Sequence, residues 1–224
     1  MEFIFKTTRL KFEVPHLEKN MRNSRNVFET FDILFPNIQE SNRLKNLRKM
    51  KLGGTELKTS CIPCNTVEGC RTIIVPVVDK ADSEAALKHV MSTYFMKGEP
   101  VCLLSVDQSL PQAEQLLSEG HDVVRYSSTE NVSQLKEYIK NPRGILMLLA
   151  DDFSGMQSRN LIIMDSRKSS ECNSPNLPLD IRNYILRGNS FVVMIINEAQ
   201  INDIESLLES NSVSVDNFQW SRVA

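Results

Sequence analysis

The feature that most constrains the fold of this chain is an alternation, from residue 71 onward, of largely apolar runs with amphipathic segments. The apolar runs are rich in β-branched and aliphatic residues, which is typical of buried strands. They are RTIIVPVV (71–78), VCLLSV (101–106), HDVVRY (121–126), GILMLLA (144–150), NLIIMD (160–165) and FVVMII (191–196). Strands that are apolar on both faces predict a parallel sheet with helices on each side.

The segments between these runs repeat apolar residues at helical spacing. Helices are expected at 24–35, 83–98, 111–120, 131–141, 178–187 and 198–210. Because strand–helix–strand crossovers are right-handed, this order predicts an α/β fold with a doubly wound, mainly parallel sheet. Such sheets generally bind ligands in the loops after the carboxyl ends of their strands, so the polar turn at 150–160 is a candidate ligand site.

The first 70 residues are less regular. Residues 5–14 favour a strand, and the mixture of Asn, Lys, Gly, Pro and Cys at 36–70 favours a long loop or insertion. We therefore expect a single domain at 1–210 and a C-terminal tail at 211–224.

The composition of the chain is that of an ordinary globular protein. It has 224 residues, of which 41% are hydrophobic and 24% charged, and a formal net charge of −2. This charge gives no general attraction to nucleic acid or to anionic membranes. No apolar run reaches the roughly 18 residues of a membrane span. The first residues do not read as a secretion signal, and an odd number of cysteines, five, favours a reducing compartment, the cytoplasm or nucleus.

Few of the motifs that signal chemistry are present. The chain has no GxxxxGK(S/T), HExxH or GxSxG pattern. Cys61, Cys64 and Cys70 lack a fourth ligand at zinc-finger spacing, so reduced loop cysteines are the preferred interpretation over a metal site. Asp151 and Asp152 are adjacent aspartates in a turn, which are commonly solvated. We expect no metal, no cofactor and no catalytic residue in this chain.

The chain's two later histidines, His89 and His121, do not follow a catalytic pattern either. The first lies within an expected helix and the second begins an expected strand. Both are interpreted as structural or surface residues.

Three stretches are more informative when they are taken together. LEKNMRNSRNV (17–27) places Arg22 before a helix, the turn at 150–160 contains Gly155 and Gln157, and Arg187 ends a helix just before a strand. In a parallel sheet these turns can converge on one edge. Two guanidinium groups there would suit a polyphosphate, although a surface salt bridge is the alternative for any single arginine.

In their order and spacing these stretches resemble the second RecA-like domain of superfamily 1 helicases, within the fold class of P-loop nucleoside triphosphatases. LEKNMRNSRNV resembles motif IV, ILMLLADDFSGMQSRNLIIM resembles motif V and NYILRGNSFVVMI resembles motif VI. The resemblance covers residues 14–196 and implies a residual nucleotide site. It assigns Arg22 to nucleotide contact, Gly155 to the motif V glycine, Gln157 to the ribose-binding position and Arg187 to the γ-phosphate.

The departures from this family are equally informative. The motif V lysine is Ser154, its glutamate is Gln157, and the alanine after the motif VI arginine is Gly188. The family's first domain, with its phosphate loop and magnesium-binding motif, precedes motif IV, where this chain begins. Because phosphoryl transfer requires that lysine and Mg²⁺, the resemblance implies no ATP hydrolysis by this chain alone. Similar divergence occurs in Schlafen-like helicase halves.

The favoured hypothesis is a degenerate, non-catalytic helicase-like module that acts as a protein-interaction or regulatory domain. The first alternative is a nucleic-acid-binding domain that completes an ATPase site with another chain, to which the basic stretch 42–51 could contribute. The second is a small-ligand enzyme of another doubly wound class. A protein partner is expected, a membrane is not, and the oligomeric state stays open.

Overall fold

The computed structural model describes residues 19–20, 23–34, 62–63, 69–106, 117, 120–127, 132–153, 156–167, 184–200 and 213–216. The chain divides into two compact units, Met1–Asn20 with Asn37–Cys64 and Met21–Pro36 with Asn65–Ala224. In the first unit, β1 (Lys19–Asn20) pairs in parallel with β2 (Ile62–Pro63). All other described elements belong to the second unit.

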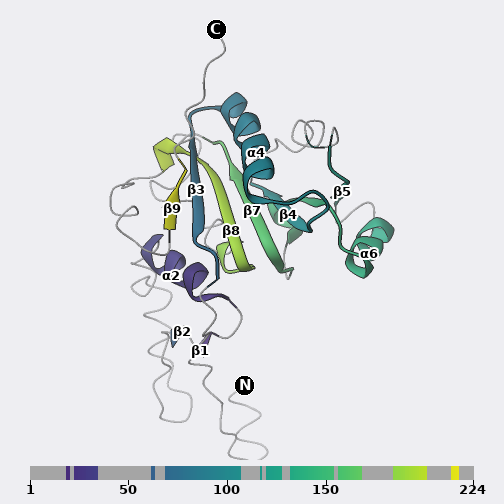
Figure 1. The fold of residues 1–224 in the computed structure, drawn as a ribbon, viewed down its shortest axis with the longest axis horizontal. Helices are drawn as coiled ribbons and strands as arrows, with labels where there is room; N and C mark the ends of the chain where they lie inside the picture. Colours follow the sequence, from purple (N-terminus) through teal and green to yellow (C-terminus); the bar gives the residue numbers. More distant parts are fainter. Residues whose placement is uncertain are drawn as a thin grey trace, which may run out of the picture. The chain divides into compact units, whose positions relative to one another are not determined.

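The second unit is built on a sheet in which the seven described strands are all parallel (Figure 1). The strands are β3 (Thr72–Val77), β4 (Val101–Ser105), β5 (Val123–Tyr126), β6 (Ile145–Leu149), β7 (Ser158–Asp165), β8 (Gly188–Asn197) and β9 (Val213–Val215). Their order across the sheet is β5-β6-β4-β7-β8-β3-β9. The predicted doubly wound, parallel α/β fold is confirmed.

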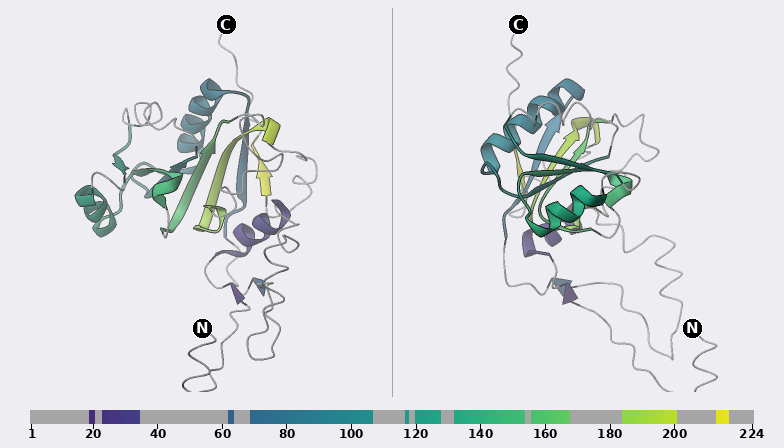
Figure 2. Two further views of the ribbon diagram at one scale, coloured as in Figure 1. Left: turned by 180° about the vertical axis from the view of Figure 1, so that it is seen from behind. Right: turned by 90° about the vertical axis from the view of Figure 1, so that its right-hand side faces the viewer.

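Helical elements lie on both faces of this sheet (Figure 2). On one face lies α4 (Lys80–Tyr94), and on the other lie α6 (Val132–Lys140) and the short 3-10 helix η2 (Ala150–Phe153). A further helix, α2 (Arg25–Leu34), contacts β8 and β3. Covering both faces explains why successive residues within β3, β4, β6, β7 and β8 are apolar and buried.

The core consists of two apolar layers, one on each side of the sheet. On the α4 side, alternate strand residues pack with the helix in one buried cluster, which includes Ile73, Val75, Leu103, Ile162, Ile195, Leu87 and Val90. The strand residues between them are also fully buried, among them Ile74, Leu104, Leu148, Ile163 and Ile196. Since successive side chains of a strand point to opposite faces, both layers come from the same strands.

The segment between β6 and β7 differs from expectation. Both strands pair in parallel with β4, one on each side of it, so the chain must return from the carboxyl end of β6 to the amino end of β7. The 3-10 helix η2 forms the described first part of this return, and Met156 and Gln157 form its described end. Only the beginning of the expected ligand turn therefore lies at the carboxyl edge, and Gln157 lies at the amino edge, next to Ser158.

Several expected elements have different bounds. Helix α4 begins at Lys80 because the side chain of Asp79 accepts a hydrogen bond from the Asp82 N–H at 2.9 Å, an N-cap, and it ends at Tyr94 rather than Gly98. Of the helix expected at 198–210, the described part is a 3-10 turn, η4 (Glu198–Gln200).

Other expected elements lie outside or partly outside the described residues. These are the strand at 5–14, the helix at 111–120 except Leu117 and Gly120, and the helix at 178–187 up to residue 183. Strand β9 falls within the expected C-terminal tail and forms the edge of the sheet beside β3.

Two glycines in the left-handed region provide a matched test of this packing. Gly144 has φ +67° and Gly98 has φ +82°, but only at Gly144 would an added Cβ overlap a neighbour, the backbone carbonyl of Asp122. We expect Gly98→Ala to cost about 1–2 kcal/mol, the strain of the left-handed conformation alone. Gly144→Ala should cost clearly more, as measured by urea denaturation. Equal losses of unfolding free energy in the two variants would contradict the close approach of the Asp122 carbonyl, just before β5, to Gly144.

Candidate functional site

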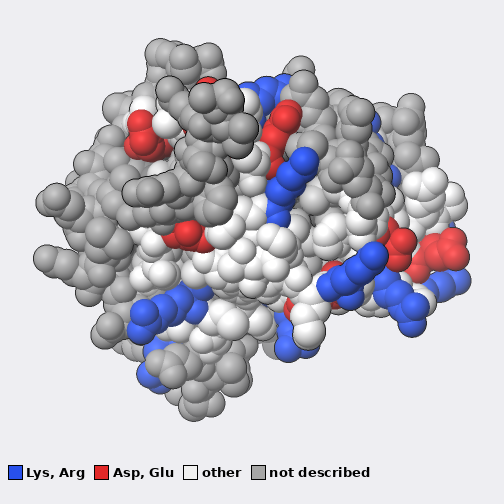
Figure 3. Space-filling view, turned by 45° about the horizontal axis from the view of Figure 1, so that its top comes forward, with Lys and Arg blue, Asp and Glu red and all other residues white. Residues whose placement is uncertain are grey.

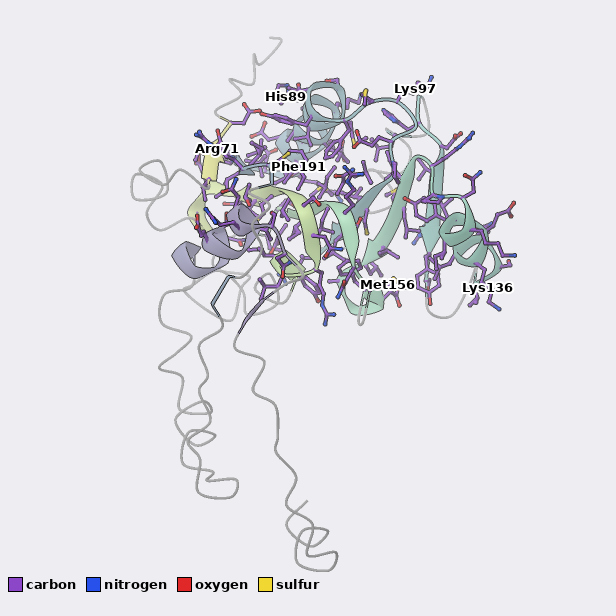
Figure 4. The ribbon with its side chains drawn as sticks, turned by 60° about the horizontal axis from the view of Figure 1, so that its bottom comes forward. Arg71, His89, Lys97, Lys136, Met156 and Phe191 are labelled. Atoms are coloured by element: carbon purple, nitrogen blue, oxygen red, sulfur yellow. The ribbon has the colours of Figure 1, made fainter. Side chains whose placement is uncertain are left out.

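The amino ends of β7 and β8 bring together two of the residues singled out in the sequence. Ser158 pairs with Gly188, and the Ser158 N–H donates a hydrogen bond to the Arg187 carbonyl at 3.0 Å. Gln157 and Arg187 immediately precede this pair on neighbouring strands, so they lie side by side. Gln157 is exposed and Arg187 is half-buried. Figure 4, which brings the amino edge forward, labels the preceding residue, Met156, just before the amino end of β7.

The motif IV-like stretch contacts the backbone around Arg187 through the side chain of Asn23. Its side-chain amide donates hydrogen bonds to the carbonyls of Leu186, at 2.9 Å, and Gly188, at 2.8 Å. These carbonyls flank Arg187, whose own N–H donates to the Tyr184 carbonyl at 2.9 Å. The backbone around Arg187 is therefore fixed on both sides by a buried side chain from a segment more than 160 residues away.

Helix α2 holds this segment against the edge of the sheet. The Ser24 N–H donates to the Asn189 carbonyl at 2.8 Å, and the Asn26 amide donates to the Gly69 carbonyl at 3.1 Å. One turn further on, the buried hydroxyl of Thr30 donates to that of Thr72, at the start of β3, at 2.9 Å. The polar residues of α2 thus satisfy backbone and side-chain groups at the amino ends of β8 and β3.

The four predicted nucleotide-site residues divide into two pairs. Gln157 and Arg187 are adjacent, as described above, and Arg22 and Gly155 lie outside the described residues. Arg22 directly precedes Asn23, whose position at Arg187 is described. Asn23 itself was not predicted as a site residue, because no local pattern distinguishes a buried asparagine that binds distant carbonyls from one in a solvated turn.

The carboxyl edge, where parallel sheets generally bind ligands, is occupied by a network of buried polar side chains. Asp165 is fully buried and accepts two hydrogen bonds from the Arg167 guanidinium, at 2.9 and 2.8 Å. Asn197 donates to the carbonyls of Val78, at 2.9 Å, and Ser166, at 3.3 Å, and Gln200 donates to the Arg167 carbonyl. These groups connect the ends of β3, β7 and β8 to one another, so among the described residues they serve the structure.

A second polar cluster joins the end of β9 to α4 through hydrogen bonds. The Asp216 carboxylate accepts a hydrogen bond from the Tyr94 hydroxyl at 2.7 Å and lies 2.8 Å from His89 Nε2, while the Asp216 N–H donates to the Ile74 carbonyl. The Tyr94 ring also packs edge-on against Phe191. His89 therefore has a structural contact, in keeping with its interpretation from the sequence.

The thiols and acidic groups of the described residues form no evident metal centre. Within those ranges, no three His, Cys, Asp or Glu side chains are grouped as metal ligands. Cys70 is exposed, and burial raises the pKa of the Cys102 thiol. Cys61 and Cys64 lie outside the described residues. None of the described helices is both long and apolar enough to cross a membrane.

Comparisons with known proteins concern the fold. No protein-family model matches the sequence, and no curated protein matches it either. Among solved structures, the C-terminal domain of the DEAD-box protein Dbp5 is similar over 66% of this chain and 89% of that domain, with a TM-score of 0.44 and 10% identity. Saccharomyces cerevisiae Dbp5 bound to RNA and ADP BeF3 is similar over 82% of this chain and 58% of its own, with a TM-score of 0.47 and 8% identity.

A third structure is the C-terminal domain of a possible DNA helicase from Lactobacillus plantarum. It is similar over 88% of this chain and 98% of its own, with a TM-score of 0.39 and 10% identity.

The contribution of Asn23 can be measured directly. We expect Asn23→Ala to lower the free energy of unfolding by about 2 kcal/mol or more, because two carbonyls lose their donor. Asn23→Asp, which keeps the size but replaces the amide by a carboxylate, should be at least as destabilising. The control Asn141→Ala, at an exposed position, should change stability by less than about 0.5 kcal/mol. Similar values for Asn23→Ala and the control, from denaturant titration, would contradict this role.

The cluster around Asp216 predicts a pH effect. Burial, followed by the hydrogen bond to Asp216 and the charge of that carboxylate, raises the pKa of Tyr94 to about 12 from 10.0. Because the folded state holds this proton more tightly, its stabilising effect is complete below pH 10 and is lost as the pH rises towards 12.

In Asp216→Asn, the pKa of Tyr94 should fall, while that of Tyr138, also raised to about 12 chiefly by burial, should not. Phenolate absorbance during a pH titration measures both groups, and Tyr94→Phe identifies the signal of Tyr94. An unchanged titration in Asp216→Asn would show that the carboxylate does not act on this phenol.

Proposed function

We propose that this chain is a non-catalytic, helicase-like module that acts as a protein-interaction or regulatory domain and presents half of a nucleotide pocket to a protein partner. The observation that carries the proposal is the adjacency of Gln157 and Arg187 at the amino ends of β7 and β8. A guanidinium group binds phosphate oxygens in bidentate fashion, and a neighbouring amide is able to hydrogen-bond a ribose hydroxyl.

The rigidity of this place supports a binding role. Asn23 occupies the carbonyls on both sides of Arg187, and the Arg187 backbone donates to Tyr184 and accepts from Ser158. A residue held in this way loses little backbone freedom when its side chain binds a ligand, and such preorganisation improves affinity.

The residues present do not support hydrolysis by the chain alone. Transfer of a phosphoryl group depends on a lysine and Mg²⁺ at the β- and γ-phosphates, and the sequence contains no phosphate-loop pattern that would place them. Ser154 and Gln157 stand where the related motif has a lysine and a glutamate. An arginine in this position therefore requires a partner to supply the remaining groups.

The two alternatives have less support. A small-ligand enzyme would be expected to use the carboxyl edge, where the described polar side chains instead hydrogen-bond the strand ends. A nucleic-acid-binding domain depends on phosphate contacts that release counterions, and the net charge of −2 gives this chain no general attraction to nucleic acid.

The proposal predicts binding of ATP without hydrolysis. The purified chain should release no phosphate above the buffer rate, and ATP should shift the amide resonances of Ser158 and Gly188 in NMR titrations. Arg187→Ala should weaken this binding by about tenfold or more, since a charge-assisted contact is lost. Lys88→Ala, at an exposed position of α4, is the control and should have no effect. Hydrolysis that Arg187→Ala abolishes, or equal ATP affinity in both variants, would overturn the proposal.

A further inference from the structure

Five neighbouring strands of the sheet each have a basic residue at or just before their amino end. In order across the sheet, these are Arg143 before β6, Lys97 before β4, Arg159 in β7, Arg187 before β8 and Arg71 before β3. All except the half-buried Arg187 are exposed. We call these five residues the basic row; Figure 4 labels Arg71 and Lys97 on the edge that it brings forward.

The register of the sheet keeps the four arginines of the basic row close together along the strand direction. Neighbouring strands are about 4.8 Å apart, so four spacings extend the row over roughly 19 Å. Val101 pairs with Ile145, Asn160 pairs with Phe191, and Ile73 pairs with Val193. By this register, Arg71, Arg143, Arg159 and Arg187 lie within about three residues, roughly 10 Å, of one another along the strands.

The charges of the basic row are largely unopposed among the described residues. No ion pair joins any of the five to a described side chain. Described acidic residues near the same edge include Glu99, Asp122 and, on α2, Glu29. Both oxygens of Glu99 are engaged, one by the Asn160 amide at 2.9 Å and the other by the Met96 N–H at 3.1 Å. The balance of described charges at this edge is therefore positive.

The other surfaces of the unit differ from this edge. Described acidic residues lie at the carboxyl ends of the strands, namely Asp79 and Asp82 after β3, Asp152 after β6, and Glu198 after β8. On the face formed by α4 and the carboxyl edge, acidic and basic side chains are interspersed (Figure 3). Because the whole chain has a net charge of −2, the row is a local concentration of cations rather than a general property.

We propose that the basic row docks onto an acidic surface of a protein partner. This inference rests on the proposed function, because it names the kind of partner that would cover the half-pocket at Arg187. Four of the five residues are arginines, which bind carboxylates in bidentate fashion and are enriched at protein interfaces. The side chain of Met96, next to Lys97, is 78% exposed and adds an apolar contact of the kind common at interfaces.

A protein suits this edge better than a nucleic acid. Proteins that bind single strands combine a basic groove with exposed aromatic rings on which bases stack. Every aromatic ring whose exposure is described is buried or half-buried, and Phe191, at this edge, already packs against Tyr94 and Phe95.

The test compares two labelled anionic probes, an oligoglutamate peptide and an oligouridine of equal charge, by fluorescence anisotropy at two salt concentrations. The double variant Arg71→Glu/Arg159→Glu removes two members of the row and keeps Arg187. Lys80→Glu/Lys88→Glu makes the same change in charge at exposed positions of α4 and is the control. Should the first variant not fold, as judged by circular dichroism, Arg71→Gln/Arg159→Gln replaces it, with Lys80→Gln/Lys88→Gln as its control.

We expect the full chain to bind oligoglutamate more tightly than oligouridine. The Arg71→Glu/Arg159→Glu variant should lose about tenfold or more of its affinity for oligoglutamate, and the Lys80→Glu/Lys88→Glu control should not. Equal or tighter binding of oligouridine, equal losses in both variants, or no binding of oligoglutamate would overturn the inference. The ATP titration with Arg187→Ala reports separately on the half-pocket, since both variants retain Arg187.

Discussion

The parallel pairing of every described strand is the constraint on which the rest of the structure depends. Because all strands point the same way, residues that precede strands far apart in the chain meet at a single edge. Residues 157 and 187 become neighbours for this reason, and Asn23, which precedes α2, donates hydrogen bonds to the carbonyls beside residue 187. The same constraint requires the chain to return to the amino edge between β6 and β7, which places Gln157 there rather than at the carboxyl edge.

The two edges of the sheet use polar residues in different ways. At the carboxyl edge, Asn197 and Gln200 donate hydrogen bonds to carbonyls that follow other strands, and Asp165 accepts from Arg167, so their polarity satisfies buried groups. At the amino edge, Asn23 fixes the backbone of Arg187 and leaves the guanidinium group of that residue outside these hydrogen bonds. This difference, rather than any single motif, is why we place binding at the amino edge.

Much of the fold could be predicted from the sequence, because it depends on local patterns. All six apolar runs predicted as strands correspond to strands, and the helices expected at 24–35 and 131–141 correspond to α2 and α6. Short elements, and elements whose ends depend on a cap, were harder to predict from the sequence. Strand β9 has three residues and gains its stability from pairing with β3 and from the contacts of Asp216, neither of which is visible in a local window.

The sequence by itself determined the class of fold, because the burial of strands on both faces is recorded directly in their composition. It also singled out Gln157 and Arg187, but only as residues of two separate motif-like stretches. Their adjacency, the role of Asn23 and the alignment of Arg71, Arg143 and Arg159 along one edge were decided by the tertiary structure. These relations depend on strand order and register, which arise from contacts between distant segments and leave no periodic signal in the chain.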